Sequence, residues 1–482
     1  MDLVAEVLAS CARTPRATAI IDPRGRELSF GALRERVLRI RDRLAGAGFE
    51  PGQSVLYAVQ PSPDAIAVAL GAVAAGGTLV FADPGLAPGV LEARLRLARP
   101  GWVVAESFLY AITATAAGRA LVRRRGVLLP ALSQAAVRHA YTGRWLPGVP
   151  SGAVRLHGLD APFDAALGEA DLDAPAAVIF TSGTTAHPRA VVHTRRSLAA
   201  GLQIFMDRFP LGPGDVVHTD GLMLGLPALI GGATWSMPGS LDGRGVTHLY
   251  QVPVEAARLT ELPGTVRHLL LGSAPAPPAV LRRCLEICPG EVHSVYAMTE
   301  ALPIALASAE EKLAYSGGDL LGEPLPGVGV RFTADRELVV SGPHVARGYL
   351  GEPPVTEVPT GDLARLDEQG RLVLLGRKKD MLLREGFNIY PSLYEPSIAA
   401  LPGVREAALI GLPDPATGDE EVVLALVPGD GFEEQAVRRR LPEVMDAGAL
   451  PDRIQVFPDF PRAGRSHKLD RPALRDQLTR PR

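Results

Sequence analysis

The stretch AAVIFTSGTTAHPR, residues 176–189, decides the fold, because an apolar strand-like run leads directly into a loop of small, hydroxyl-bearing residues. A helix is predicted to begin near Arg195. Backbone amides and hydroxyls at such a junction can surround the oxygens of a polyphosphate, and an arginine can neutralise its charge. The predicted phosphate-binding residues are Thr181, Ser182, Gly183, Thr184, Thr185 and Arg189. The loop lacks the GxxxxGKS/T pattern of a P-loop, and taken alone it also fits an ordinary turn.

The same alternation of helices and short strands extends on both sides of this stretch. A helical pattern at 28–48 precedes a strand-like run, and the apolar runs within 266–275 and 291–300 each end in small or polar residues. This rhythm predicts an α/β fold on a parallel sheet, with ligands at the carboxyl ends of the strands. The uncharged run 65–82 predicts a buried helix followed by a buried strand, since it is rich in alanine and interrupted by glycines.

Composition limits the classes of partner. With 482 residues the chain exceeds the size of one hydrophobic core, so at least two domains are expected. Its 50 basic and 53 acidic residues give a net charge of −3, which excludes the basic footprint of a nucleic-acid-binding protein. Three cysteines argue against a disulfide framework, and the first residues do not resemble a signal peptide. We therefore expect a cytoplasmic protein with no membrane span.

The pattern changes towards the C-terminus. From about Asp335, short strand-like runs with turn residues replace the α/β rhythm, and the charged cluster 377–380 follows. Beyond it, residues 405–441 contain two apolar runs and a helical pattern, which is enough for a small α+β domain. We predict a large N-terminal domain over 1–376 and a small C-terminal domain over 377–482.

The sequence resembles the superfamily of adenylate-forming enzymes, which includes acyl-CoA synthetases, nonribosomal-peptide adenylation domains and firefly luciferase. Six signatures occur in the order of that superfamily and cover nearly the whole chain. They are FTSGTTAHPR (180–189), VYAMTE (295–300), VVSGPHVARGYL (339–350), TGD (360–362), GRKKDM (376–381) and KLDR (468–471). The resemblance implies a large α/β AMP-binding domain, a small mobile α+β C-terminal domain, and the conversion of a carboxylic acid and ATP into acyl-AMP and pyrophosphate.

The motif VYAMTE implies much of the nucleotide site. By resemblance Tyr296 stacks on adenine, while Thr299 and Glu300 are catalytic, the first reaching the α-phosphate and the second holding Mg²⁺. A hard dication prefers carboxylate and phosphate oxygens, so one glutamate with the oxygens of ATP is a sufficient site. The resemblance also places a loop between adenine and the acyl pocket. The remaining nucleotide-binding residues are Gly272, Ser273 and Ala274 in that loop, and Ala297 after the stacking tyrosine.

Charged residues of the later motifs complete the implied site. Asp362 resembles the carboxylate that accepts hydrogen bonds from both ribose hydroxyls, and Arg377 would also contact the ribose. Lys379 occupies the hinge position, where a few backbone torsions reorient the small domain. Lys468 resembles the catalytic lysine that bridges the substrate carboxylate and the α-phosphate, where a cation stabilises the developing charge.

The sequence departs from the usual pattern at five of these positions. Ala186 and Ala190 replace glycines of the phosphate loop, and Arg189 replaces its lysine. Glycine tolerates positive φ, and arginine offers a planar fork where lysine offers a point charge. Ala297 replaces a common glycine, and His467 stands where glycine usually precedes the catalytic lysine. These departures bear on rate more than on the class of reaction.

A second step is implied, in which domain rotation presents a thiol that takes the acyl group. The segment REGFNIYPSLYE, residues 384–395, resembles the motif of thioester formation. Gly386 and Phe387 stand where a pantetheine tunnel would pass, and Glu395 stands at the acidic position of the motif. CoA is therefore the first expectation for the thiol, and an acyl-carrier protein is the alternative.

The sequence is also compatible with two other functions. YAMTEALPIA (296–305) and YEP (394–396) also resemble the β-lactone synthetases, which share the fold and close a ring without a thiol. The altered glycines and His467 leave room for a non-catalytic AMP-binding protein.

The acid itself is suggested only by composition. The expected pocket segments, 218–226, 250–254 and 301–304, are mostly apolar, with no acidic or basic residue placed to receive an amino acid's charged groups. We expect a fatty or an aromatic acid.

Overall fold

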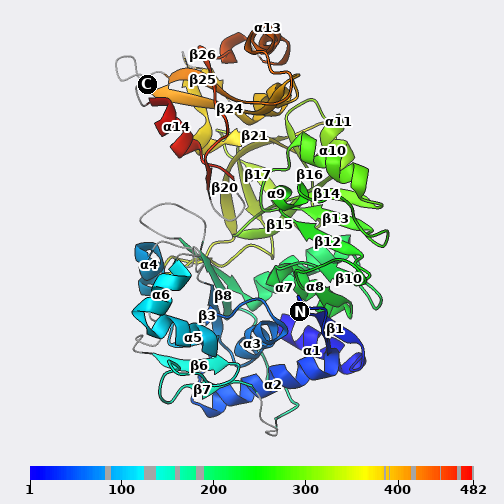
Figure 1. Cartoon of the computed structure of the whole chain (residues 1–482). Coiled ribbons are helices and arrows are strands. Elements are labelled where there is room, and N and C mark those ends of the chain that lie inside the picture. Colours follow the sequence, from blue (N-terminus) through cyan, green and yellow to red (C-terminus); the bar gives the residue numbers. More distant parts are fainter. Residues whose placement is uncertain are drawn as a thin grey trace. The chain divides into compact units, whose positions relative to one another are not determined.

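The computed structural model of the chain (Figure 1) describes residues 1–81, 88–123, 137–157, 163–180, 189–384, 387–389, 391–413, 420–445, 447–463 and 468–479. Two compact units make up the chain. Unit 1 comprises Met1–Leu249, Thr299–Leu302 and Gly342–Thr356, and unit 2 comprises Tyr250–Met298, Pro303–Ser341 and Glu357–Arg482. The predicted boundary between residues 376 and 377 falls inside unit 2 and stays a prediction.

Unit 1 contains an eight-stranded sheet in the order β19-β9-β8-β4-β3-β5-β6-β7. Neighbouring strands from β8 to β7 run parallel, whereas β9 and β19 join in antiparallel fashion. The strands are β3 (Ser54–Ala58), β4 (Thr78–Phe81), β5 (Trp102–Glu106), β6 (Arg138–Thr142), β7 (Val154–Arg155), β8 (Pro175–Phe180), β9 (Ala190–Thr194) and β19 (Gly348–Tyr349). The parallel α/β sheet predicted for the first half is confirmed.

A second group of strands in unit 1 has the order β10-β11-β1-β2. These are β1 (Thr18–Ile21), β2 (Glu27–Ser29), β10 (Val216–His218) and β11 (Thr234–Ser236). The helices of unit 1 are α1 (Leu3–Arg13), α2 (Phe30–Gly46), α3 (Pro63–Ala74), α4 (Pro88–Ala98), α5 (Ser107–Ala114), α6 (Ala116–Arg123), α7 (Arg195–Arg208) and α8 (Leu222–Gly231).

The uncharged run 65–82 forms most of the buried helix α3 and the buried strand β4, as predicted. Ser62 begins α3 by accepting a hydrogen bond from the Ala65 amide at 3.1 Å, and a proline at the first helical position suits this start. A Cβ at Gly71 would lie 2.7 Å from the Ile40 side chain of α2, so glycine allows the two helices to pack closely. In the described part of the chain, no helix has the length and apolar character that crossing a bilayer requires.

Unit 2 contains all or part of the strands that follow the order β17-β18-β20-β21-β16-β15-β14-β13-β12, and Figure 1 shows β12, β13 and β14 side by side. Their bounds are β12 (His248–Gln251), β13 (His268–Leu271), β14 (Glu291–Met298), β15 (Ala301–Ser308), β16 (Asp319–Pro324), β17 (Gly329–Phe332), β18 (Glu337–Ser341), β20 (Glu357–Leu366) and β21 (Leu372–Arg377). Three short helices accompany them, α9 (Pro253–Ala256), α10 (Pro278–Ile287) and α11 (Ala309–Ala314).

The C-terminal part of unit 2 has the predicted α+β character. Its three-stranded sheet has the order β24-β25-β26, and alternate residues of β25 enter two different cores. Val422 and Leu424 pack with α12 and α13, whereas Val423 and Ala425 pack with α14, as the two-residue period of a strand requires. The elements are η2 (Lys378–Asp380), β22 (Leu382–Arg384), β23 (Phe387–Ile389), α12 (Pro391–Ala399), β24 (Val404–Pro413), β25 (Glu420–Pro428), α13 (Glu434–Val444), η3 (Ala447–Ala449), β26 (Arg453–Val456), β27 (Arg462–Ala463), β28 (Lys468–Leu469) and α14 (Arg471–Thr479).

Candidate active site

The predicted phosphate loop joins β8 to β9 in unit 1. Phe180 at the end of β8 pairs with Ala190 at the start of β9, so hydrogen-bonded strand ends close the loop. Helix α7 begins at Arg195, as predicted, but the strand β9 precedes it, which the sequence analysis missed although the run AVVHT is rich in β-branched residues. Thr181, Ser182, Gly183, Thr184, Thr185 and Ala186 lie outside the described residues.

Glu300, the predicted Mg²⁺ ligand, is a buried carboxylate with 8% of its surface exposed. The Tyr349 hydroxyl donates a hydrogen bond to Glu300 Oε1 at 2.7 Å. Burial raises the pKa of Tyr349, and the bond to Glu300 raises it further, so the phenol keeps its proton. Tyr349 therefore orients the carboxylate through one oxygen, while Oε2 stays outside this bond.

Arg189 reaches the same cluster from the end of the phosphate loop. Its guanidinium carbon lies 3.5 Å from the centre of the Tyr349 ring, within the range of a cation–π contact. Its Nη2 lies 4.0 Å from Glu352 Oε2, and 57% of the side chain is exposed. The predicted phosphate cation and the predicted metal ligand thus contact the same tyrosine.

His193 fixes the backbone beside Glu300. It is buried, and its Nε2 lies 2.7 Å from the Thr299 carbonyl oxygen, while Nδ1 lies 3.2 Å from Ser197 Oγ. Burial lowers the pKa of His193 and keeps the ring neutral, so Nε2 must carry the proton that it donates to the carbonyl. Sequence reasoning missed both His193 and Tyr349, although Tyr349 lies in the signature at 339–350, to which no role was assigned.

Tyr296, Asp362 and Arg377 come together in unit 2. Asp362 and Arg377 are direct partners across the antiparallel pair β20–β21, with Arg377 Nε 3.0 Å from Asp362 Oδ1. The Tyr296 hydroxyl donates to Asp362 Oδ2 at 2.6 Å. Burial, followed by the charge of Asp362, raises the pKa of Tyr296 well above its usual value. The structure thus joins three predicted nucleotide-binding residues that are up to 81 positions apart.

The backbone of Asp362 is held from its own strand as well. The residue is 4% exposed, and its amide donates to Thr360 Oγ1 at 3.1 Å. An acidic side chain buried this far needs partners, and the phenol and the guanidinium supply them. Oδ2 thus faces the phenol and Oδ1 faces the guanidinium.

The loop after β13 is constrained by Tyr250. A Cβ at Gly272 would lie 2.4 Å from the Tyr250 hydroxyl, and that hydroxyl lies 3.1 Å from Ser273 Oγ. Ser273 itself has φ of 66°, in the left-handed region that few residues other than glycine adopt. The segment Gly272–Ala274 is therefore shaped by close packing against Tyr250. From the sequence, Tyr250 was expected only in the acyl pocket.

Two departures from the superfamily pattern fall in ordinary strand backbone. Ala190 lies in β9 and Ala297 in β14, and neither has a positive φ. Alanine meets no backbone strain at either position.

Lys468 lies at the start of β28, opposite Ala463. The residue keeps an exposed surface, yet loss of hydration at its ammonium lowers its pKa, the charge of Arg377 lowers it further, and Asp362 opposes both. The charges of the predicted ribose-binding pair thus act on the predicted catalytic lysine. His467 lies outside the described residues, and so does the side chain of Lys379, whose backbone belongs to η2.

Glu395 has a structural set of contacts. Its carboxylate accepts two hydrogen bonds from Arg471 Nη2, at 2.8 and 2.6 Å, and one from the Leu409 amide at 2.7 Å. These bonds tie together α12, β24 and α14. Gly386 and the side chain of Phe387, predicted for the pantetheine tunnel, lie outside the described residues.

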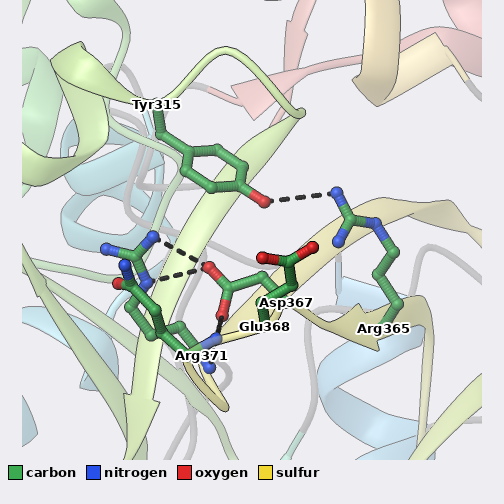
Figure 2. Close-up of a pocket in the computed structure, with 6 residues that line it drawn as sticks. Tyr315, Arg365, Asp367, Glu368 and Arg371 are labelled. Atoms are coloured by element: carbon green, nitrogen blue, oxygen red, sulfur yellow. Dashed lines mark hydrogen bonds and ion pairs between the residues drawn. The ribbon is translucent and has the colours of Figure 1, made fainter.

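A surface cavity of about 340 Å³ is separate from these clusters (Figure 2). Both arginines that line it have partners within it, since Arg371 Nε lies 2.9 Å from Asp367 Oδ2 and Arg365 donates to the Tyr315 hydroxyl at 3.2 Å. No predicted site residue lines it, so it does not mark the candidate active site. The expected acid-pocket segments are divided between the two units, and the pocket stays a prediction.

Comparisons with known proteins cover most of the chain. The family described as AMP-binding enzyme matches residues 7–350, and the AMP-binding enzyme C-terminal domain matches residues 394–468. These two matches confirm a large N-terminal domain followed by a small C-terminal domain. A feruloyl-CoA synthase from an Amycolatopsis species is 30% identical over 466 residues, which cover 87% of this chain and 87% of that protein.

Two solved structures share the fold over almost the entire chain. The amide bond synthetase McbA from Marinactinospora thermotolerans has a TM-score of 0.82 and 22% identity, and covers 99% of this chain and 99% of its own. The o-succinylbenzoate CoA synthetase MenE from Bacillus subtilis, in complex with ATP and magnesium ion, has a TM-score of 0.76 and 21% identity. The match covers 98% of this chain and 99% of the MenE chain.

Proposed function

Because this chain belongs to the family of AMP-binding enzymes, we propose that it converts an aromatic or fatty carboxylic acid and ATP into acyl-AMP, then transfers the acyl group to the thiol of CoA. That the chain is an enzyme of the adenylate-forming, acyl-CoA ligase-like kind follows from the family and from its 30% identity to a feruloyl-CoA synthase. The name of that relative favours an aromatic acid.

One geometric observation carries the proposal: the Tyr296 hydroxyl and the Arg377 guanidinium both meet the buried carboxylate of Asp362, and the charges of Arg377 and Asp362 act on Lys468. In the proposed site Asp362 accepts hydrogen bonds from the ribose, and the α-phosphate of ATP is bonded to the 5′ oxygen of that same ribose. A cation next to that pair is therefore positioned to draw the substrate carboxylate and the α-phosphate together.

The first step needs two anions to approach each other. The carboxylate oxygen attacks the α-phosphorus, the bond to the β-phosphate oxygen breaks, and pyrophosphate leaves. Lys468 offsets the repulsion, and the Thr299 hydroxyl is the proposed donor to the α-phosphate, with His193 holding its backbone. A buried carboxylate with one oxygen outside the bond to Tyr349 suits Mg²⁺, so Glu300 would hold the ion that ATP brings with it.

The second step requires Lys468 to give way to the thiol. We propose that the backbone around Lys379 is the hinge for this change, as the position of GRKKDM in the superfamily implies. CoA is favoured over a carrier protein by the segment at 384–395 and by the named relative. The relatives given above include no β-lactone synthetase, and that alternative now depends on the two short stretches alone.

Pyrophosphate release with a panel of acids tests the first step. We expect aromatic acids to release pyrophosphate, and added CoA to turn a single turnover into many. Acyl-CoA as the product supports the proposal. An amide formed when amines replace CoA would show that an amine is the acceptor, and a β-lactone formed from a β-hydroxy acid would show that no thiol is used. If no acid released pyrophosphate, the adenylation itself would be refuted.

Lys468→Ala separates the two half-reactions. We expect acyl-AMP formation to fall by at least about a hundredfold, as for loss of a group that stabilises developing charge. Transfer from supplied acyl-AMP to CoA should keep most of its rate, because Lys468 has no part in that step. Lys312→Ala on α11 is the control for the loss of a lysine. If Lys468→Ala lost the same share of its rate in both half-reactions relative to this control, the assignment of Lys468 would be contradicted.

A further inference from the structure

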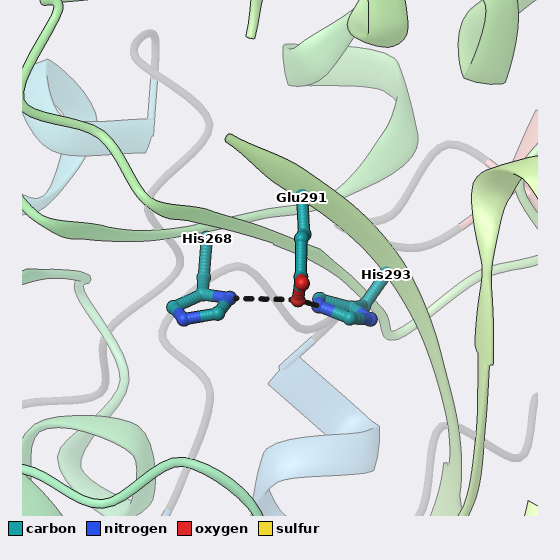
Figure 3. A group of neighbouring side chains, drawn as sticks. All are labelled: His268, Glu291 and His293. Carbon is teal, nitrogen blue, oxygen red and sulfur yellow. Dashed lines mark hydrogen bonds and ion pairs between the residues drawn. The ribbon is translucent and has the colours of Figure 1, made fainter. Parts of the chain in front are cut away.

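Three side chains suited to metal binding meet at the amino ends of β13 and β14, namely His268, Glu291 and His293 (Figure 3). The two strands pair in parallel, with His268 opposite Glu291. Residues in register on neighbouring strands share a face of the sheet, as do residues two apart on one strand. The three side chains therefore project from one face, whereas the intervening Leu269 and Val292 are fully buried.

The ligand atoms lie close enough to share one ion. Glu291 Oε2 is 3.0 Å from His293 Nε2 and 3.4 Å from His268 Nδ1, and all three ligand atoms lie within 4.8 Å of one another. Exposure increases outwards, from 4% for the side chain of His293 to 24% for His268 and 64% for Glu291. An ion can thus enter from the side of the carboxylate.

We propose that His268, Glu291 and His293 form a binding site for a divalent transition metal of the Zn²⁺ class, distinct from the site for Mg²⁺ and ATP. Two imidazoles with one carboxylate favour such an ion, whereas Mg²⁺ favours oxygen ligands alone. Metal–ligand bonds of about 2.0–2.2 Å in a tetrahedron place ligand atoms roughly 3.3 Å apart. The distances of 3.0 and 3.4 Å match this spacing, and water would fill the fourth position.

Binding changes the protons of the cluster in a defined way. Each imidazole that now contacts the carboxylate must present a bare nitrogen to the metal, so a neutral ring carries its proton on the other nitrogen, and only a charged ring releases a proton to solvent. Cys288 is nearby, with Sγ 3.9 Å from the Glu291 carbonyl oxygen, but burial raises the pKa of its thiol and it is not among the grouped ligand atoms. The thiol is therefore excluded from the proposed ligand set.

The place of the cluster suggests what a bound metal would do. The carboxyl ends of the same two strands lead to Gly272 and carry Tyr296, both proposed to contact the nucleotide. Glu291 is five residues from Tyr296, roughly 16 Å along a strand. A metal that joins β13 to β14 would fix their register beneath the nucleotide site without touching the nucleotide, and its role is structural.

Titration of tag-free, chelator-treated full-length protein with Zn²⁺ alone, and with Co²⁺ for its absorption spectrum, tests the proposal. We expect one equivalent to bind, with a tetrahedral cobalt spectrum and a zinc-dependent rise in melting temperature. His268→Ala and Glu291→Gln alter the more exposed ligands and should weaken binding by at least about tenfold. His293→Gln gives the same expectation for the buried ligand, and circular dichroism reports whether it folds.

Matched controls use a histidine and a thiol outside the set. His157→Ala removes an imidazole that also lies near a carboxylate, 3.5 Å from Asp64, and Cys288→Ser removes the neighbouring thiol. Both variants should bind metal as the unaltered protein does. The proposal would be overturned by the absence of stoichiometric binding, which would leave a hydrogen-bonded cluster without metal. It would also be overturned if His268→Ala and Glu291→Gln bound metal unchanged, or if a thiolate-to-cobalt absorption band appeared.

Discussion

At the scale of single residues, Tyr349 links two groups whose roles were assigned separately. Its hydroxyl bonds to Glu300 and its ring lies against Arg189. The two contacts use different parts of one side chain, so substitution can remove them one at a time.

Tyr349→Phe should raise the Mg²⁺ concentration needed for half-maximal pyrophosphate release by about tenfold, since loss of a partner that orients a metal ligand typically weakens metal binding by that amount or more. The ring remains, so the contact with Arg189 should persist. Tyr349→Leu removes both contacts and should also raise KM for ATP. Identical Mg²⁺ dependence in the unaltered enzyme and Tyr349→Phe would show that the hydroxyl does not position Glu300.

The pH dependence of adenylation should report on Lys468. Loss of hydration and the Arg377 charge lower the pKa of Lys468, and Asp362 opposes them. Lys468 must be protonated to act, so the rate should fall as pH rises through this lowered pKa, at a lower pH than an ordinary lysine would give.

Removing the charge of Arg377 or of Asp362 should move the alkaline fall in opposite directions. Arg377→Met should move the alkaline fall in kcat/KM to higher pH, and Asp362→Asn should move it to lower pH. Lys378→Met is the matched control, because Lys378 pairs with Asp335 and Glu337 at 2.7 and 2.8 Å and is not among the charges that shift Lys468. If kcat/KM fell at the same alkaline pH in both variants, the fall would not report the titration of Lys468.

At the scale of elements, strand ends position the candidate site. The register of β20 and β21 sets Asp362 opposite Arg377, and β13 ends where Gly272 meets Tyr250. In both places the ladder of backbone hydrogen bonds fixes the spacing between side chains before any ligand binds.

Gly272→Ala should raise KM for ATP roughly tenfold, because the added methyl would lie 2.4 Å from the Tyr250 hydroxyl and overpacking of this kind costs about 1–3 kcal/mol. Tyr250→Phe combined with Gly272→Ala removes the oxygen and leaves a ring carbon at 3.1 Å as a near neighbour, so part of the affinity should return. If the double variant is no better than Gly272→Ala, the clash with the hydroxyl is not the cause.

At the scale of the whole molecule, the buried histidines make stability depend on pH. Burial, followed by the charge of Arg244, lowers the pKa of His218 from 6.5 to about 4. His218 Nδ1 lies 3.0 Å from Ser236 Oγ within the β10–β11 pair. The unfolded chain binds the proton first as pH falls, so the stabilisation is complete above pH 6.5 and is lost between 6.5 and about 4.

Thermal unfolding measured through this pH range should show the effect. We expect His218 to account for about 3 kcal/mol of lost stability, because burial lowers its pKa from 6.5 to about 4 and each tenfold change in proton affinity is worth about 1.4 kcal/mol. His218→Asn has no group to titrate and should give a shallower fall, with His344, whose pKa burial also lowers to about 4, still contributing. If the stability of His218→Asn fell equally steeply with falling pH, His218 would not contribute to the pH dependence.

The sequence by itself determined several of the elements and the family. The strand within 176–180, the buried helix and strand within 65–81 and the α+β pattern after residue 377 depend on local periodicity and turn residues, and the structure has them where they were predicted. The order of six motifs was enough to identify an adenylate-forming chain, because each motif carries its own residues in a short span.

Only the tertiary structure decided which side chains meet. Tyr349 and Glu300 are 49 residues apart, and His193 and Thr299 are 106 apart, so no local spacing could reveal either contact. The same holds for His268 and Glu291, which strand pairing brings together from separate segments. Periodicity reports which face of an element is buried, whereas the pairing of distant strands sets the neighbours of a functional group, and that pairing is decided by the packing of the whole chain.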